Sequence, residues 1–392
     1  MVWPNRGVAH RPVVMGTRGM VASANPLASL AGLRILMQGG NAIDAAVATA
    51  AALNVVEPYM SGLGGDGYMV VYTASDRRLR VLDYMGLTPA GASPDAYAND
   101  AEKYHGGKSM LVPGAAGGWL TALEEHGRLD RSAVFAPAIE YAEGGVALTL
   151  KNEFFFARAN SGGYLEPEAK AVFQPSGTVP SAGDIIAQPA LAKTFRTLVT
   201  GGKEAFYRGP IGQEIVRTVQ AKGGFLTEQD LADFTPEWQD TACTDYRGYE
   251  IHCPLPPCSG IQYLETLNLI EAEDVGAMGH NSPRTIHLFA EAMKLAVADR
   301  IAFSARSDVP TTGLLAKAYA AERRKLIDPD RAAASEGDRF DQRLTGSGIV
   351  QPGEPGLFIP ECTTHFDVVD SEGNAVSVTQ SLGDGFGSGV MA

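Results

Sequence analysis

Residues 363–381, TTHFDVVDSEGNAVSVTQS, carry the pattern that decides how the C-terminal part of the chain folds. Apolar and polar residues alternate on both sides of the turn-forming segment Asp370–Asn374, which is typical of a β-hairpin. A turn centred on Glu372 pairs Thr363, at the start of the first strand, with Ser381, near the end of the second. A slip of one residue would turn every side chain to the other face, so the pattern predicts a definite register.

The Thr363 hydroxyl is a candidate nucleophile, because it starts a strand and faces the hydroxyl of Ser381. No general base lies near it in sequence, but cleavage of the chain before Thr363 would free an α-amino group that can act as the base. The structural alternative is that threonines start this strand only because they favour strands. Residues 328–362 are polar and rich in Gly, Pro, Asp and Arg, which predicts a flexible segment leading into a processing site.

Other parts of the chain carry plain helix and strand signals. We predict helices from Pro26 to Gly39-Gly40 and from Asn41 to about Val55, strands at 68–72 and 79–83, and mainly helical structure from about 119 to 245. Ser282-Pro283 predicts the start of an amphipathic helix, whose apolar positions keep helical spacing at Ile286, Phe289, Ala290, Met293, Val297 and Ile301.

The glycine-rich segment Gly62–Gly67 formally matches the dinucleotide-binding pattern G-x-G-x-x-G. That mechanism needs a strand, then the glycines, then a helix that meets the pyrophosphate. Here a predicted helix precedes the glycines and a predicted strand follows them, so the order argues against a dinucleotide site. We expect these glycines to allow positive φ and a close approach of the backbone.

Five segments together resemble the γ-glutamyltranspeptidase family, and they occur in the same order as in that family. They are Asn41–Ala46 through Glu57-Pro58, Ser61–Gly65 with the strand after it, Val112–Gly114, His287–Arg300, and Thr363–Asp370 with Gly373–Val376. The resemblance implies an N-terminal-nucleophile (Ntn) hydrolase precursor of the α+β class, an αββα sandwich that is incomplete in this chain. It also implies self-cleavage between Cys362 and Thr363, which divides the chain into a large-subunit segment, 1–362, and the start of a small subunit, 363–392.

By the same resemblance, Thr363 is the catalytic nucleophile and Ser381 orients its hydroxyl, as a threonine does in the family. Thr379, two residues away on the same face, is a possible secondary partner in substrate binding. The expected substrate is a small γ-glutamyl or other acyl amide, with water or an amino acid or peptide amine as the acceptor. No cofactor is expected.

Three positions depart from the family pattern. The arginine that grips the α-carboxylate of the γ-glutamyl group is Met85 here, and an asparagine near the α-carbon of the substrate is Gly383. Asp66 stands in a stretch that is otherwise glycine in the family. A hydrogen bond to a charged group contributes roughly 1.5–3 kcal/mol, so these changes put γ-glutamyl specificity in doubt, whereas the amide-cleaving residues are retained.

The resemblance implies that the second subunit of the family continues past the position of Ala392. The Gly-Gly oxyanion donors and the Ser, Asp and Glu side chains that hold the amino group of the substrate belong to that continuation. Loss of each oxyanion donor costs on the order of 10²–10³ in rate. Three interpretations therefore stay open: a γ-glutamyltransferase-like precursor, a β-lactam side-chain (glutaryl or cephalosporin) acylase-like enzyme, and a non-catalytic truncated fragment.

Composition narrows the remaining possibilities. The chain has 392 residues, a net charge of −13 and a pI near 5.0, which argues against a nucleic-acid or anionic-membrane partner. Neither a secretory signal nor an apolar run long enough to span a bilayer is visible, so we expect a cytoplasmic protein. Cysteines 243, 253, 258 and 362 fit a reducing compartment, and their spacing with His252 matches no zinc pattern, so no metal is expected.

Overall fold

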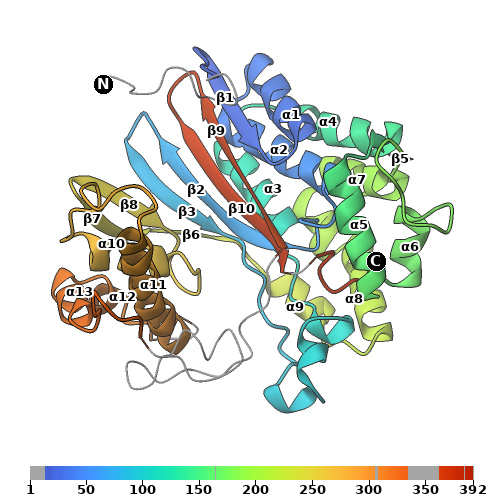
Figure 1. Ribbon diagram of the computed structural model, residues 1–392. Helices are drawn as coiled ribbons and strands as arrows, with labels where there is room; N and C mark the ends of the chain where they lie inside the picture. The colour runs from blue at the N-terminus through green and yellow to red at the C-terminus, as the bar shows by residue number, and fades with distance from the viewer. Residues whose placement is uncertain (1–13, 164, 305–307, 334–361, 384, 392) are drawn as a thin grey trace.

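The computed structural model describes residues 14–163, 165–304, 308–333, 362–383 and 385–391. Its centre is an antiparallel sheet in which the described residues form six strands, in the order β1-β9-β10-β2-β3-β6 (Figure 1). These strands are β1 (Gly19–Ser23), β2 (Asp66–Thr73), β3 (Arg78–Asp83), β6 (Glu237–Gln239), β9 (Cys362–Asp370) and β10 (Ala375–Gly383). The hairpin near the C-terminus therefore occupies the middle of a sheet built otherwise from the N-terminal two thirds of the chain.

The predicted hairpin register is confirmed. Ser381 pairs with Thr363 and Ala375 with Val369, as a turn centred on Glu372 requires. The Asp370 carboxylate closes that turn, because Oδ1 accepts hydrogen bonds from the backbone N–H of Glu372 (2.9 Å) and Asn374 (3.0 Å). Its Oδ2 accepts from the Asn374 side chain (2.8 Å) and from the backbone N–H of Ala42 (3.1 Å), which ties the hairpin to the start of a helix.

That helix, α2 (Ala42–Val56), is buried along its whole length. Asn41 and Asp44 form a capping box at its start, as the asparagine predicted. Small side chains let it lie between the sheet and the outer helices: a Cβ on Gly32 of α1 (Pro26–Met37) would stand 2.3 Å from the Thr49 hydroxyl. The predicted boundaries of α1, α2, β2 and β3 agree with the structure to within about two residues.

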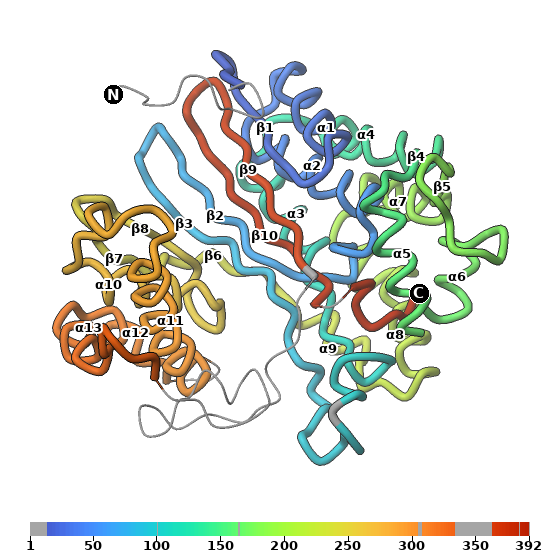
Figure 2. Tube along the Cα trace, in the orientation of Figure 1, coloured from blue at the N-terminus to red at the C-terminus, as the bar shows by residue number. Residues whose placement is uncertain are grey.

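Further helices extend this layer on the same side of the sheet (Figure 2). They are α3 (Ala115–His126), α4 (Arg131–Gly144), α5 (Leu150–Gly162), α6 (Pro167–Phe173), α7 (Pro189–Tyr207), α8 (Pro210–Ala221) and α9 (Glu228–Asp233), with the small β4 (Val146–Ala147) and β5 (Ile185–Ile186) pair and the 3₁₀ turns Pro94–Ala96, Asp100–Lys103 and Gly107–Ser109. Phe366, Val368, Val376 and Val378 of the hairpin are at most 1% exposed against this layer. The opposite face of the hairpin, with His365, Asp367 and Thr379, is exposed.

A second unit lies across the sheet from α1 and α2 (Figure 1). It consists of the two-stranded sheet β7 (Ala242–Tyr246) and β8 (Tyr249–Cys253), with α10 (Ile261–Ile270), α11 (Pro283–Phe303), α12 (Thr311–Leu314) and α13 (Lys317–Arg324). Helices, sheet, sheet and helices thus follow one another in the order of an αββα sandwich, and the described residues contribute two strands to the second sheet. No helix in this described part of the chain is both long and apolar enough to cross a membrane.

The structure corrects two of the predictions. The region from 119 to 245 is mainly helical only up to Asp233, after which β6 and β7 begin. Helix α11 starts where Ser282-Pro283 predicted, but Ile286 and Met293 of the predicted apolar set are 58% and 42% exposed. The buried face carries Leu288, Ala292 and Leu295 together with the acids Glu291 and Asp299. The spacing of apolar residues did not identify this face, because two of its buried residues are acidic.

Two further points concern strand β1 and the segment that precedes β9. Strand β1 was not predicted; it is short, and it exists because it pairs with β9 far along the chain. Most of the predicted flexible segment, residues 334–361, lies outside the described residues.

We expect Asp370→Ala to lower the free energy of unfolding by about 2–4 kcal/mol, because it removes a charged acceptor from four hydrogen bonds. Urea denaturation measures the change. Asp76→Ala is the matched control: this exposed aspartate accepts a single local bond in the β2–β3 turn, and its loss should cost about 0.5 kcal/mol or less. Equal effects of the two substitutions would contradict the anchoring role of Asp370.

Candidate active site

The two hydroxyls predicted to meet do so at one end of the sheet. Thr363 Oγ1 lies 3.1 Å from Ser381 Oγ, and both side chains are partly exposed. The Ser381 oxygen also accepts a hydrogen bond from the backbone N–H of Gly383 (2.8 Å). The pairing register between β9 and β10 shifts between Ser381 and Gly383. The backbone of β10 bends at this point, and the Gly383 N–H comes back towards the serine side chain. A threonine hydroxyl is thereby held at the start of a strand, beside the bond that joins it to Cys362.

The glycine-rich loop supports this end of β10 by close backbone contact. A Cβ on Gly65 would lie 2.1 Å from the carbonyl oxygen of Ser381, and a Cβ on Gly67 would lie 2.3 Å from that of Thr379. The loop joins α2 to β2, so the helix–glycine–strand order that argued against a dinucleotide site is confirmed. The Gly65 carbonyl accepts hydrogen bonds from the N–H groups of Gly114 and Ala115, both at 2.9 Å, which joins the loop to the start of α3.

A buried polar network behind the hairpin was not predicted. Gln380, 1% exposed, donates to the hydroxyl of Ser61 (3.1 Å) and to the carbonyl of Ala50 in α2 (3.3 Å). Asn54 also donates to Ser61, at 3.0 Å. The network links α2, the loop and β10. Its only sequence signal was a polar residue at an inward position of the predicted strand.

Thr379 and His365 form the next pair along the exposed face. The His365 Nδ1 and Thr379 Oγ1 atoms are 2.9 Å apart, and His365 Nε2 lies 3.3 Å from a carboxylate oxygen of Asp367. Thr379 is on the same face as Thr363, as expected, but its hydroxyl contacts the ring of His365. Its part in substrate binding stays a prediction.

The three departures from the family pattern gather at the same end of the sheet as Thr363. Asp66 starts β2 directly opposite Ser381, Gly383 ends β10, and Met85 follows the end of β3. The Met85 N–H donates to the Asp83 carboxylate (2.9 Å), and burial raises the pKa of that carboxyl. Gly383 has φ +84° and no atom within 4 Å of a Cβ built on it, so an asparagine, which tolerates this conformation, would fit there.

The cysteine–histidine cluster in the second unit does not resemble a metal centre. The Cys243 sulfur lies 3.7 Å from His252 Nε2, and burial raises the pKa of the Cys253 thiol to about 12, which disfavours the thiolate that binds metals. Within the ranges that the structure describes, there is no group of three or more His, Cys, Asp or Glu side chains placed to hold a metal ion.

Comparison with known proteins agrees with this geometry. The sequence profile described as Gamma-glutamyltranspeptidase matches residues 28–392. The chain belongs to the γ-glutamyltranspeptidase family. Members of this family are enzymes, hydrolases and acyltransferases.

Relatives with two different activities match this γ-glutamyltranspeptidase-family chain equally well. The glutathione hydrolase proenzyme of Bacillus subtilis (strain 168) is 36% identical, over 97% of this chain and 67% of that protein. The Acylase ACY 1 proenzyme of Pseudomonas sp. (strain V22) is also 36% identical, over 96% of this chain and 67% of that protein. The chain thus spans about two thirds of the length of these relatives.

A solved structure confirms the expected fold. The cephalosporin acylase from Bacillus halodurans superimposes with a TM-score of 0.85 at 34% identity, covering 100% of this chain and 71% of that one. The α+β Ntn-hydrolase architecture predicted for this γ-glutamyltranspeptidase-family chain is therefore correct.

We expect Gly65→Ala to lower the free energy of unfolding by about 1–3 kcal/mol, because the new methyl group collides with the β10 backbone beside Ser381. Gly64→Ala is the matched control, since nothing lies within 4 Å of a Cβ at Gly64. Urea denaturation of both variants measures the difference. If both substitutions were equally well tolerated, the loop could not be in close contact with β10.

Proposed function

We propose that the chain is a precursor that cleaves itself between Cys362 and Thr363 and then transfers acyl groups through Thr363. The observation that carries the proposal is the 3.1 Å contact between the partly exposed Thr363 and Ser381 hydroxyls near the start of β9. On this proposal the chain divides into 1–362 and 363–392, and the two segments remain joined through the sheet.

Self-cleavage proceeds in two steps. The Thr363 oxygen attacks the carbonyl carbon of Cys362, the C–N bond breaks, and the nitrogen takes up the hydroxyl proton and leaves as the α-amino group of Thr363. Water then hydrolyses the resulting ester, which yields the Cys362 carboxylate and restores the Thr363 hydroxyl. Ser381 orients the hydroxyl for the attack.

The freed α-amino group then serves as the general base. Its unperturbed pKa of about 7.7–8.0 lies near the pH at which a base is most effective. It takes the Thr363 hydroxyl proton while the oxygen attacks the amide substrate, and the proton passes to the amine that leaves. Water or a second amine releases the acyl group from Thr363 and regenerates the hydroxyl.

The acyl group is the open part of the specificity. The names of the relatives point to glutathione, a γ-glutamyl amide, and to cephalosporins. Met85 cannot grip a carboxylate as an arginine does, and Gly383 offers no side chain. Both favour a small amide whose acyl group has no α-amino acid head, within an otherwise γ-glutamyltransferase-like enzyme.

The remaining expectations stay predictions: a cytoplasmic location, no nucleic-acid or membrane partner, no cofactor, and participation of Thr379 in substrate binding. The non-catalytic alternative stays open until self-cleavage is measured.

The purified 392-residue chain should be cleaved into two polypeptides, the smaller beginning with Thr363. Thr363→Ala should abolish cleavage because it removes the nucleophile. Ser381→Ala should slow cleavage about threefold to tenfold, because it removes one orienting hydrogen bond of about 0.5–1.5 kcal/mol, and Ser381→Thr should be tolerated. Intact-mass spectrometry over time measures all three.

Ser377→Ala provides the matched control, because Ser377 lies on the same strand and face but pairs with Asp367, away from Thr363. It should cleave at the unaltered rate. A wild-type chain that stays in one piece would favour the non-catalytic fragment.

Met85→Arg should improve γ-glutamyl donors selectively in the processed protein, because it restores a bidentate, permanently charged partner for a carboxylate. The gain should be partial, since Gly383 leaves a second contact missing. The measurement is kcat/KM for a γ-glutamyl anilide against a glutaryl anilide. Leu87→Arg, which adds the same charge at an exposed position in the same loop, should give no selective gain.

Efficient γ-glutamyl cleavage by the unaltered protein would mean that another residue has taken over the role of the arginine. Absence of turnover of both anilides would contradict the enzymatic proposal.

A further inference from the structure

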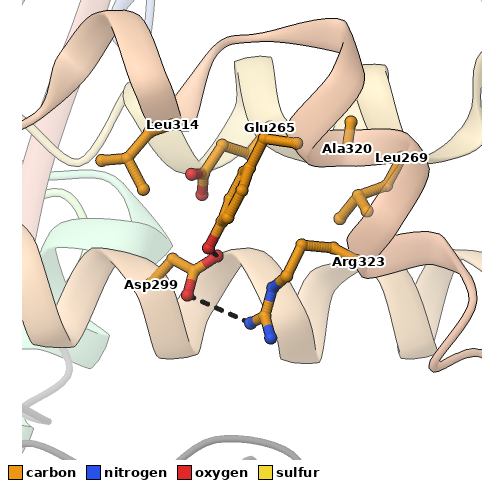
Figure 3. Close-up of a pocket in the computed structure, with 7 residues that line it drawn as sticks. Glu265, Leu269, Asp299, Leu314, Ala320 and Arg323 are labelled. Carbon is orange, nitrogen blue, oxygen red and sulfur yellow. Dashed lines mark hydrogen bonds and ion pairs between the residues drawn. The ribbon is translucent and has the colours of Figure 1, made fainter.

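A buried acid without a partner lies far from the candidate active site, in the helical unit behind β7 and β8. Glu265 of α10 is 3% exposed, and neither of its carboxylate oxygens has a hydrogen-bond partner among the described residues. It lines a cavity with Asp299 of α11 and with Tyr319 and Arg323 of α13 (Figure 3). A buried carboxylate is costly unless something supplies a counter-charge or a proton.

The neighbouring groups already have partners. Asp299, 5% exposed, accepts hydrogen bonds from Arg323 Nη2 (3.0 Å) at one oxygen and from the Tyr319 hydroxyl (2.8 Å) at the other. The positive charge of Arg323 is therefore engaged by Asp299. With two carboxylates and one guanidinium, the cluster lacks one positive charge.

The cavity selects the size and chemistry of what could supply that charge. Its volume of about 10 Å³ has room for roughly one sphere of the size of water. The atoms that could coordinate a cation there are all oxygens. They are both carboxylate oxygens of Glu265, the Asp299 oxygen that Tyr319 contacts, and the Tyr319 hydroxyl oxygen. Carboxylate and hydroxyl oxygens suit hard cations, but a divalent ion would leave an excess positive charge beside Arg323.

We propose that this cavity between α10, α11 and α13 binds one dehydrated monovalent cation of about the size of water, such as K⁺ or NH₄⁺. The ion would bridge Glu265 and Asp299 and hold α13 against the two longer helices. This site is independent of the function proposed for Thr363. It predicts a stabilising effect of a specific ion rather than of ionic strength.

The competing occupant is a proton. Burial, followed by repulsion from Asp299, raises the pKa of Glu265 to about 9, while Arg323 lowers it. A protonated Glu265 with one water, which could also accept from the unpartnered Arg323 Nε, would satisfy the cavity without any cation. A cation and this proton exclude each other, so their pH dependences differ.

The test is thermal unfolding of the 392-residue chain at constant ionic strength, in KCl, NH₄Cl, NaCl and choline chloride, at pH 6 and pH 8. We expect K⁺ and NH₄⁺ to raise Tm saturably, by about 1–3 °C at ten times Kd, and more at pH 8, where less proton competes. Glu265→Gln should abolish the ion effect. Glu322→Gln, which removes an exposed acid of α13 paired with Lys325, is the control and should keep it.

A proton in the cavity, instead of a cation, would give a different dependence of Tm on pH. A group whose pKa is raised on folding stabilises fully below its unfolded pKa and loses that stabilisation as the pH rises towards its folded pKa. If a proton fills the site, Tm will not depend on the identity of the cation and will be lower at pH 8 than at pH 6, and Glu265→Gln will reduce that difference. This outcome overturns the proposal, as does an equal Tm in choline chloride and in KCl at both pH values.

A second measurement does not depend on the variant folding. In crystals of the unaltered chain grown with RbCl, anomalous scattering should show Rb⁺ between Glu265 and Asp299. A cavity without an anomalous peak at saturating Rb⁺ would also overturn the proposal.

Discussion

The pairing register of β9 and β10 is the constraint on which the candidate site depends. One face of the hairpin packs Phe366 and Val378 against α2, so the hydrophobic core holds the register. A slip by one residue would expose those side chains to solvent and bury Thr363. The Asp370 carboxylate also stabilises this register, because it accepts hydrogen bonds from both the hairpin turn and the N-terminus of α2. The position of the candidate nucleophile is thus set by core packing at some distance from it.

The far end of the hairpin is held by backbone contact rather than by side chains. Gly65 and Gly67 bring the loop against the carbonyl groups of β10, and the Gly65 carbonyl receives the first N–H groups of α3. Gln380 then ties the same strand to Ser61 and α2 from the buried side. The glycine-rich loop, the start of α3 and α2 are therefore linked to the end of β10 that carries Ser381.

The sequence predicted local elements well where a single physical rule determines the structure of a segment. Alternation and turn chemistry gave the hairpin and its register, and the capping residues Asn25 and Asn41 gave both early helices. It failed where partners distant in sequence decide. Strand β1 is defined by its pairing with β9, and the buried face of α11 contains Glu291 and Asp299, which are buried because Lys294, Tyr319 and Arg323 contact them. A pattern that assigns burial to apolar residues alone cannot recover such a face.

The same distinction applies to the site. The contact between Thr363 and Ser381 followed from register alone, whereas the bond of Thr379 to His365 depended on rotamers that no spacing rule supplies.

The strand order of the sheet bears on the proposed self-cleavage. The hairpin that begins near Thr363 is flanked by β1 on one side and β2 on the other, both from the segment before the cleavage point. Cleavage before Thr363 would therefore break one covalent bond but none of the ladder hydrogen bonds that β9 makes to β1 or β10 makes to β2. The new amino group would remain beside its own hydroxyl, where it can act as the base.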